Sequence, residues 1–191
     1  AGLTATAEEL GPIFTALGSN ALGEDFLPIL SGDAVADFIR TRPAPDLLTP
    51  ALHALSACGS PRHAALALEF ATSPQNTSGD PADWVNGRAA QAVATLGTDD
   101  QVAKILPWLK ASNPFVRFEV ACPLLLRGRP EAWPALVEAL ETNIASPLAV
   151  SARLAAAVDG LPTGDTAAEW HLWGQAVGKY RWDAEGKKWR K

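Results

Sequence analysis

Few residues of this 191-residue sequence have the types and spacing that catalysis requires. The sequence has three histidines and two cysteines, and it contains no Walker loop, Gly-x-Ser-x-Gly, His-Glu-x-x-His or Cys-x-x-Cys motif. His53, Cys58 and His63 are close in sequence, but their spacing matches no standard metal site. We interpret the histidines as surface or half-buried residues and both cysteines as small buried side chains. The sequence therefore predicts no catalytic residue, no metal site, no cofactor and no enzymatic activity.

Carboxylates are numerous, but most follow the spacing of a solvent-exposed helix face. Asp99 and Asp100 stand where a helix is expected to begin, and acids there interact favourably with the helix dipole. Glu138 and Glu141 are three residues apart, so they share one face of a helix. A charged outer face explains this pair, and an acidic binding groove is the alternative. We keep both glutamates as candidate binding residues.

The seven tryptophans are the residues best suited to binding a partner. Trp108 and Trp133 fall on helices expected to be second in their pairs, and Trp is enriched at binding hot spots, although it also packs cores well. We count both, together with Lys104, as candidate binding residues. Trp170 and Trp173 are expected to join the tryptophans of the C-terminal tail in a plug over the last helices, because a terminal repeat needs a cap.

Glycine residues divide the chain into helices, since Gly takes the left-handed conformation of a helix C-cap at low cost. Starts rich in Pro or acid follow several of these glycines. The expected left-handed stops are Gly18, Gly59, Gly97, Gly128 and Gly160. The predicted helix pairs are 7–18 with 23–31 (followed by a short helix near 33–40), 45–58 with 61–72, 82–96 with 99–110, 115–127 with 130–141, and 147–159 with 165–178.

A finer repeat, Arg-x3-Ala-x3-Leu, begins at Arg88, Arg117 and Arg153. Residues four apart share a helix face, so the Ala permits close approach of neighbouring helices and the Leu fills the seam. We expect the three arginines at helix starts, in equivalent places in successive repeats, with partners among nearby carboxylates or carbonyls. The segment 113–117, Asn-Pro-Phe-Val-Arg, resembles the start of a HEAT repeat, and this resemblance extends over roughly residues 82–160. It implies an all-α fold, a right-handed α-solenoid of about five HEAT-like helix pairs.

The C-terminal residues break the helical pattern. Residues 179–182 alternate basic and aromatic side chains, residues 183–186 (Asp-Ala-Glu-Gly) are typical of a turn, and Trp189 follows among basic residues. We predict a small β-hairpin over 179–190 that packs Trp189 on the last repeat, with Arg181 and Trp182 as candidate binding residues. The pattern Trp-x2-Trp followed by Trp-Asp-x2-Gly resembles a tail of some bacterial HEAT-repeat proteins. The predicted division is a helical repeat domain, 1–178, and a basic aromatic tail, 179–191.

Charge is unevenly placed along the sequence. The net charge is −5, while the tail has six basic and two acidic residues, so residues 1–178 have a net charge of −9. An acidic body gives no general case for binding nucleic acid, and no apolar run approaches the length needed to span a bilayer. The tail could bind its own body, a second copy or an acidic partner. A cytoplasmic location is favoured over a periplasmic or secreted one, and the oligomeric state is open.

The sequence favours a non-catalytic protein-interaction or scaffold module that binds a protein through a concave face or through the tail. Two alternatives remain. The resemblance also allows an enzyme on a HEAT-like scaffold, similar to the phycobilin lyases or to the HEAT-like DNA glycosylases. The last alternative is a structural subunit of a larger complex. A basic concave face would favour a glycosylase, a large tetrapyrrole cleft would favour a lyase, and exposed apolar area would separate a subunit from a binding module.

Overall fold

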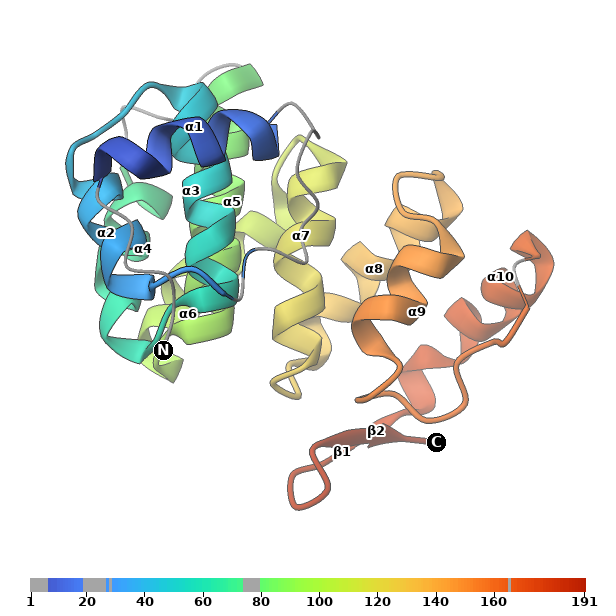
Figure 1. Ribbon diagram of the computed structural model, residues 1–191. Coiled ribbons are helices and arrows are strands. Elements are labelled where there is room, and N and C mark those ends of the chain that lie inside the picture. Colours follow the sequence, from blue (N-terminus) through green and yellow to red (C-terminus); the bar gives the residue numbers. More distant parts are fainter. Residues whose placement is uncertain (1–6, 19–26, 28, 74–79, 165) are drawn as a thin grey trace. The chain divides into compact units, whose positions relative to one another are not determined.

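The computed structural model describes residues 7–18, 27, 29–73, 80–164 and 166–191, and it is predominantly helical (Figure 1). The described part contains ten α-helices and one two-stranded antiparallel sheet near the C-terminus. The sequence-based prediction of an all-α chain with a small C-terminal hairpin is therefore confirmed. The chain forms two compact units, unit 1 (Ala1–Leu106) and unit 2 (Pro107–Lys191).

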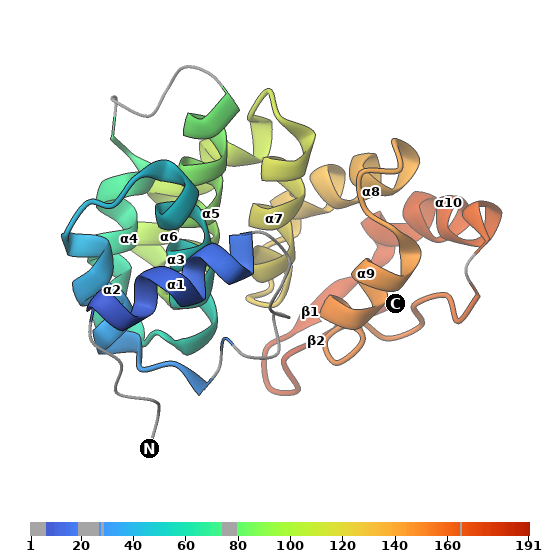
Figure 2. The same ribbon diagram turned by 45° about the horizontal axis from the view of Figure 1, so that its top comes forward.

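Unit 1 is built around two adjacent helices, α3 (Pro45–Cys58) and α5 (Asp80–Leu96), which lie side by side in Figures 1 and 2. Helices α1 (Ala7–Gly18) and α2 (Gly32–Arg40) pack on α3. The 3₁₀ helix η2 (Pro61–His63) leads into α4 (Ala64–Ala71), which packs on α5 and on α6 (Asp99–Ile105). The buried core between these helices is mostly Ala, Leu and Val, in which the small Ala side chains let the helices approach closely and the branched aliphatic ones fill the space between them.

Unit 2 contains the remaining helices and the hairpin. A 3₁₀ helix, η4 (Leu106–Lys110), comes before α7 (Pro114–Leu125), and η5 (Pro130–Ala132) leads into α8 (Trp133–Glu141). Next come α9 (Pro147–Leu154), α10 (Ala167–Ala176) and η6 (Val177–Lys179). Helix α7 packs on α8 and α9, and α8 packs on α10. Strands β1 (Arg181–Asp183) and β2 (Lys188–Arg190) complete the unit.

Helix starts follow local chemistry. The Thr98 hydroxyl accepts a hydrogen bond from the Gln101 amide, and the Gln101 side chain accepts one from the Thr98 amide, a capping box that begins α6. The side chain of Asn113 accepts the Phe115 amide with Pro114 at the first helical position, and Ser146 caps α9 in a similar way. These caps fix the directions in which α6, α7 and α9 leave their turns.

Helix ends differ from the prediction. Among the described glycines only Gly128 and Gly160 have positive φ, whereas Gly59 ends α3 at φ −73°. A Cβ atom at Gly59 would lie 2.3 Å from the Leu55 carbonyl oxygen, and one at Gly97 would lie 2.7 Å from that of Val93. The expected left-handed caps are therefore wrong at Gly59 and Gly97, where the glycines instead permit a close backbone approach.

Most predicted helices are present, but two segments need comment. The helix predicted over 23–31 falls largely outside the described residues. The helix predicted over 147–159 ends at Leu154 as α9, and turns replace its last part. None of the helices that the structure describes is long and apolar enough to cross a membrane.

Candidate functional site

The site with the most distinctive chemistry is the hairpin of unit 2, and its register separates aromatic from charged side chains. Trp182 pairs with Trp189, while Arg181 pairs with Arg190 and Asp183 with Lys188. Because side chains alternate across a strand, the two indoles share one face and the flanking charges share the other. The indole centroids are 5.4 Å apart.

The turn of the hairpin is organised by Asp183. Its carboxylate accepts hydrogen bonds from the backbone amides of Glu185 and Gly186, both at 3.1 Å, and it lies 2.9 Å from the Arg190 guanidinium. The amide of Gly186 is the main cause of the lowered pKa of Asp183, and the positive charge of Arg190 adds to it. A Cβ at Gly186 would lie 2.8 Å from this carboxylate, so the turn needs glycine there, although the left-handed residue is Lys187 (φ 49°).

A segment that the sequence predicted as helix completes the sheet. Helix α9 ends at Leu154, and Val158 then forms a parallel bridge with Trp189. The Trp189 amide donates to the Ala157 carbonyl at 2.7 Å, and the Asp159 amide donates to the Trp189 carbonyl at 3.0 Å. In the third copy of the Arg-x3-Ala-x3-Leu repeat only the arginine is therefore helical. Its Ala157 instead accepts a hydrogen bond from β2.

Trp189 fixes the hairpin to the helices. Its side chain is 2% exposed, its indole N–H donates to the Leu125 carbonyl at 2.7 Å, and its ring lies 5.2 Å from that of Trp133. The Leu125 carbonyl, in the last turn of α7, also accepts the Gly128 amide at 3.0 Å, so the indole provides its second hydrogen bond. The tail thus adds a hydrogen bond to a helix end and buries a large aromatic side chain.

Trp182 lies against the turn that follows α7. Gly128 has φ +74°, and the amides of Gly128 and Arg129 return to the carbonyls of Leu125 and Leu124, as in a Schellman motif. A Cβ at Gly128 would lie 2.5 Å from the Trp182 ring. This glycine is therefore required both by its backbone conformation and by the half-buried indole of Trp182.

The other aromatic residues of unit 2 form a buried cluster. Tyr180 accepts a hydrogen bond from the Trp173 indole at 3.2 Å, and the Trp170 indole donates to the Gly164 carbonyl at 2.8 Å. Trp133 lies within about 6 Å of Trp173 and Tyr180, is 5% exposed, and its indole N–H has no acceptor in the part of the chain that the structure describes. Such burial gives Trp133 a place in the core of unit 2. The sequence had also allowed it a place on a binding surface.

An open cleft of about 680 Å³, which we call the tail cleft, lies beside this cluster. Its walls combine apolar side chains with the basic end of the tail, and its lining residues are Asp159, Gly160, Pro162, Leu172, Trp173, Ala176, Tyr180, Arg190 and Lys191. Leu172 is 65% exposed. The Asp159 carboxylate forms ion pairs with Lys188 at 3.6 Å and with Arg190 at 4.0 Å.

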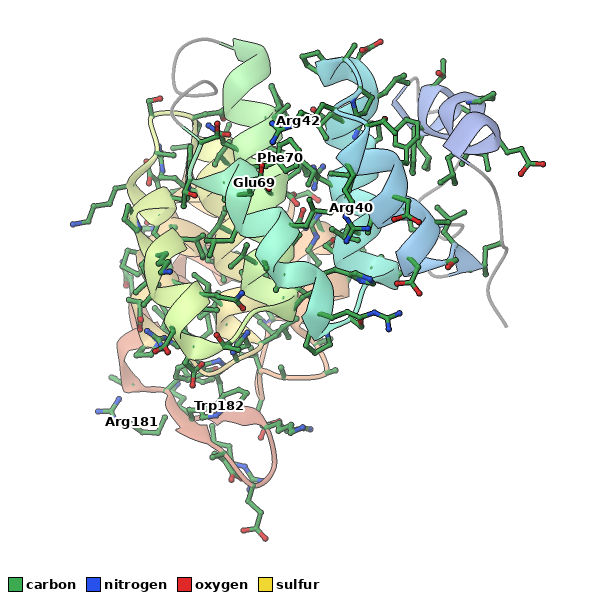
Figure 3. All side chains as sticks on the ribbon, turned by 90° about the vertical axis from the view of Figure 1, so that its left-hand side faces the viewer. Arg40, Arg42, Glu69, Phe70, Arg181 and Trp182 are labelled. Carbon is green, nitrogen blue, oxygen red and sulfur yellow. The ribbon has the colours of Figure 1, made fainter. Side chains whose placement is uncertain are left out.

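Four cations of the tail have no ion-pair partner among the described residues: Lys179, Arg181, Lys187 and Lys191. Arg181 donates only to the backbone carbonyls of Gly178 and Tyr180. In Figure 3 its side chain extends away from the hairpin, on a different side from Trp182. Arg181 stands opposite Arg190, whose charge is already balanced by Asp183 at 2.9 Å, so of these two cations it is Arg181 that lacks a carboxylate partner among the described residues.

A second cleft, of about 690 Å³, lies along α8 and α10, and we call it the α8–α10 groove. It is lined by Val137, Leu140, Glu141, Asn143, Pro147, Ala168, Trp170 and His171. Glu141 lies 3.4 Å from the His171 ring, and Leu148, next to Pro147, is 78% exposed. Glu138, on the same helix, instead pairs with Arg117 at 2.5 Å and does not line the groove.

The three repeat arginines have different environments. Arg117 in α7 pairs with Glu138 and donates to the carbonyls of Ala111 and Ser112. Arg153 instead lies in the last turn of α9 and donates to Glu119 of α7 at 2.8 Å. Arg88 lies inside α5 and donates to Gln91 at 3.0 Å. The expectation that each arginine stands at a helix start is wrong for Arg88, which lies in the middle of α5, and for Arg153, because α9 ends one residue later.

Sequence reasoning missed Glu119. It is 1% exposed, and its only signal was a carboxylate inside an otherwise apolar stretch of α7. Burial would lower the pKa of the Arg153 guanidinium, but the Glu119 carboxylate outweighs this and raises it. Burial also raises the pKa of the nearby Cys122 thiol to about 12, so this thiol stays protonated and is a poor nucleophile.

Unit 1 holds a Ser-His-Asp group that resembles a catalytic arrangement but is a helix cap. The His63 ring lies 2.9 Å from Asp33, which also pairs with Arg62. Hydrogen bonding from His63 is the main cause of the lowered pKa of Asp33. The other ring nitrogen accepts the Ser60 amide at 3.1 Å, while the Ser60 hydroxyl is 3.5 Å away. Because the backbone amide occupies that lone pair, His63 is not placed to activate the hydroxyl.

The remaining candidates, in α6 and η4, are not among the residues that line the two clefts. Lys104 is exposed in α6, and Trp108 is half-buried in η4. Arg42, at φ 54°, pairs with Glu69, and its guanidinium carbon lies 5.5 Å from the centre of the Phe70 ring. Figure 3 labels these three side chains, which lie near one another. In the described residues no group of three or more His, Cys, Asp and Glu side chains is placed to hold a metal ion.

Comparison with known proteins gives no relative from which a function could be transferred. No family model, no curated protein and no solved structure matches the chain. The function must therefore be argued from the two clefts of unit 2 and from the charge of the tail.

Proposed function

We propose that the chain is a non-catalytic protein-interaction module and that unit 2 holds the partner. The observation that carries this proposal is the distribution of exposed apolar side chains. Of the five large apolar side chains found exposed in the described residues, only Ile29 lies in unit 1, and four lie in unit 2: Leu126, Ile144, Leu148 and Leu172. Exposing a leucine side chain to water is unfavourable, so covering it with a partner lowers the free energy of the complex.

The position of these side chains supports the same proposal. Leu172 lines the tail cleft, while Ile144 and Leu148 are chain neighbours of residues that line the α8–α10 groove. Both clefts are open and have mostly apolar walls, and each has a few charged groups at its edge. Protein-binding surfaces commonly combine such an apolar centre with a polar rim.

We also propose that the helices of each unit stack as HEAT-like repeats. Supporting contacts are those between first helices, α3 with α5 and α7 with α9, and between second helices, α4 with α6 and α8 with α10. In a solenoid each repeat contacts its neighbours in this way. Small-angle X-ray scattering of the whole chain tests the stacking, since an elongated, curved particle supports it and a spherical one contradicts it.

Site-specific photocrosslinking tests the proposed function. Benzoylphenylalanine is introduced at Leu148 or at Leu172, with Ile29 of unit 1 as the matched position, and each variant is irradiated in extract of the native source. We expect discrete adducts from the unit 2 positions, identified by mass spectrometry as the same protein in repeated experiments, and none of these from position 29. An absence of adducts at both unit 2 positions, or the same adducts at all three, would contradict the proposal.

A further inference from the structure

The tail cleft has the chemistry of a site for one particular kind of protein segment. We infer that it binds an acidic segment with a single large apolar side chain, the apolar group entering the cleft and the carboxylates facing the cations of the tail. This inference rests on the proposed function, because it names the chemistry of the partner that unit 2 holds.

The apolar part of the argument comes from the cleft walls. Leu172, Trp173 and Ala176 come from α10 and Pro162 from the loop after α9, and together they form one apolar side. Leu172 lies 65% in solvent, so an incoming side chain can cover it without any rearrangement of the core. A leucine or phenylalanine side chain that covers this wall would remove its own apolar surface and that of Leu172 from water, which favours binding.

The electrostatic part comes from the rim. Arg190 and Lys191 line the cleft, and Arg181 stands opposite Arg190 across the hairpin. The cleft also contains one carboxylate, Asp159, and its contacts with Lys188 and Arg190 show that these cations already accept a carboxylate partner from the chain itself. Lys191 and Arg181, which form no ion pair with any residue that the structure describes, remain for the carboxylates of another molecule.

The same structure disfavours nucleic acid as the occupant. Proteins that hold single strands stack bases on exposed aromatic rings. The aromatic rings at this cleft are buried, with Trp173 at 7% and Tyr180 at 4% exposure, and Trp182 lies against Gly128. The rest of the chain is acidic and repels a long polyanion, while a short acidic segment can contact the tail alone.

The test is fluorescence anisotropy with a labelled, end-blocked peptide in which one leucine is flanked on both sides by glutamates. Two matched peptides, one with Gln for every Glu and one with Ser for the Leu, separate the charge from the apolar contribution. We expect the acidic leucine peptide to bind with a Kd below about 1 mM, to weaken as salt is added, and to bind at least about fivefold more tightly than either matched peptide.

Two exposed substitutions in the cleft have matched controls elsewhere. Leu172→Ser and Lys191→Glu should each weaken peptide binding about fivefold or more, whereas the exposed changes Ile29→Ser and Lys110→Glu should leave the affinity unchanged. All four variants should keep the far-UV circular dichroism of the parent, because none of these side chains is buried.

Several outcomes would overturn the inference: no binding of the peptide up to about 1 mM, equal binding of the Gln peptide, or equal losses in the cleft and control variants. If a single-stranded oligonucleotide or phosphatidylserine vesicles bound more tightly than the peptide, that ligand would be the occupant of the cleft and the inference of an acidic protein segment would be wrong. Failure here with crosslinks retained at Leu148 would leave the proposed function standing, whereas loss of crosslinks at both unit 2 positions would remove the proposed function as well.

Discussion

Single residues decide whether the hairpin can dock, and Gly128 is the clearest of them. We expect Gly128→Ala to lower the free energy of unfolding of unit 2 by about 2–3 kcal/mol, since alanine is strained at φ +74° and its Cβ would overlap the Trp182 ring. Urea titration followed by Trp fluorescence measures the change. Gly178→Ala is the matched control, because a Cβ there meets nothing within 4 Å. Equal urea midpoints for the two variants would show that the packing of Trp182 does not require glycine at position 128.

Asp183 gives the hairpin a pH dependence. Its folded-state pKa is lowered below 3.8, so its contribution to stability is present above about pH 4 and is lost as the pH falls through the folded-state value. We expect the parent to be more stable than Asp183→Asn at neutral pH, and the difference to shrink as the pH falls below the ordinary aspartate range and through the lowered folded-state pKa of Asp183. Thermal unfolding over this pH range measures it, and a difference that persists in acid would contradict the role of the charge.

The buried Glu119 is a further residue whose removal should be costly. We expect Glu119→Ala to destabilise the chain by about 2–4 kcal/mol, because it leaves the partly buried Arg153 without its carboxylate. The double substitution Glu119→Met with Arg153→Met should cost less than the sum of the single changes. A double-mutant cycle in urea provides the coupling energy, and additive losses would mean that the pair contributes nothing.

At the scale of elements, the hairpin is a structural part of unit 2, because Trp189 contributes to its core. Removing residues 179–191 should lower the melting temperature and increase the binding of an apolar dye, since the surfaces of α7 and α8 that Trp189 covers become exposed. Arg181→Ala, an exposed change in the same segment, should melt like the parent. An unchanged melting temperature after truncation would make the tail a free arm for partner binding.

Elements were also the level at which the sequence was most informative. Helix starts were predictable because their caps are local, as at Thr98 and Asn113, and the hairpin was predictable from its alternation. The end of α9 was not, because its reason is distant: the Ala157 carbonyl is taken by Trp189, about thirty residues further on. Likewise the tail cleft is lined by α10, the loop after α9 and the tail, and no local sequence pattern predicts that these three segments come together.

At the scale of the whole molecule, charge separates the two units. Unit 1 has five basic and twelve acidic residues, a net charge of −7, while unit 2 has eleven basic and nine acidic residues, a net charge of +2. An acidic partner is therefore attracted to unit 2 and repelled by unit 1, which favours one binding orientation. The same asymmetry makes association between copies a competing reaction at low salt, and binding measurements need a salt series for this reason.

The aromatic cluster of unit 2 has a spectroscopic consequence. Its indoles lie in contact pairs, with centroid separations of 5.2 Å for Trp133 and Trp189 and 5.5 Å for Trp170 and Trp173. Transitions of chromophores this close couple as excitons, so we expect the ultraviolet circular dichroism of the chain to contain paired bands of opposite sign beside the helical signal. These bands depend on the mutual angle of the rings, which is 67° in both pairs. Undocking of Trp189 would separate it from Trp133 and weaken the bands of that pair, so these bands report whether the tail is docked.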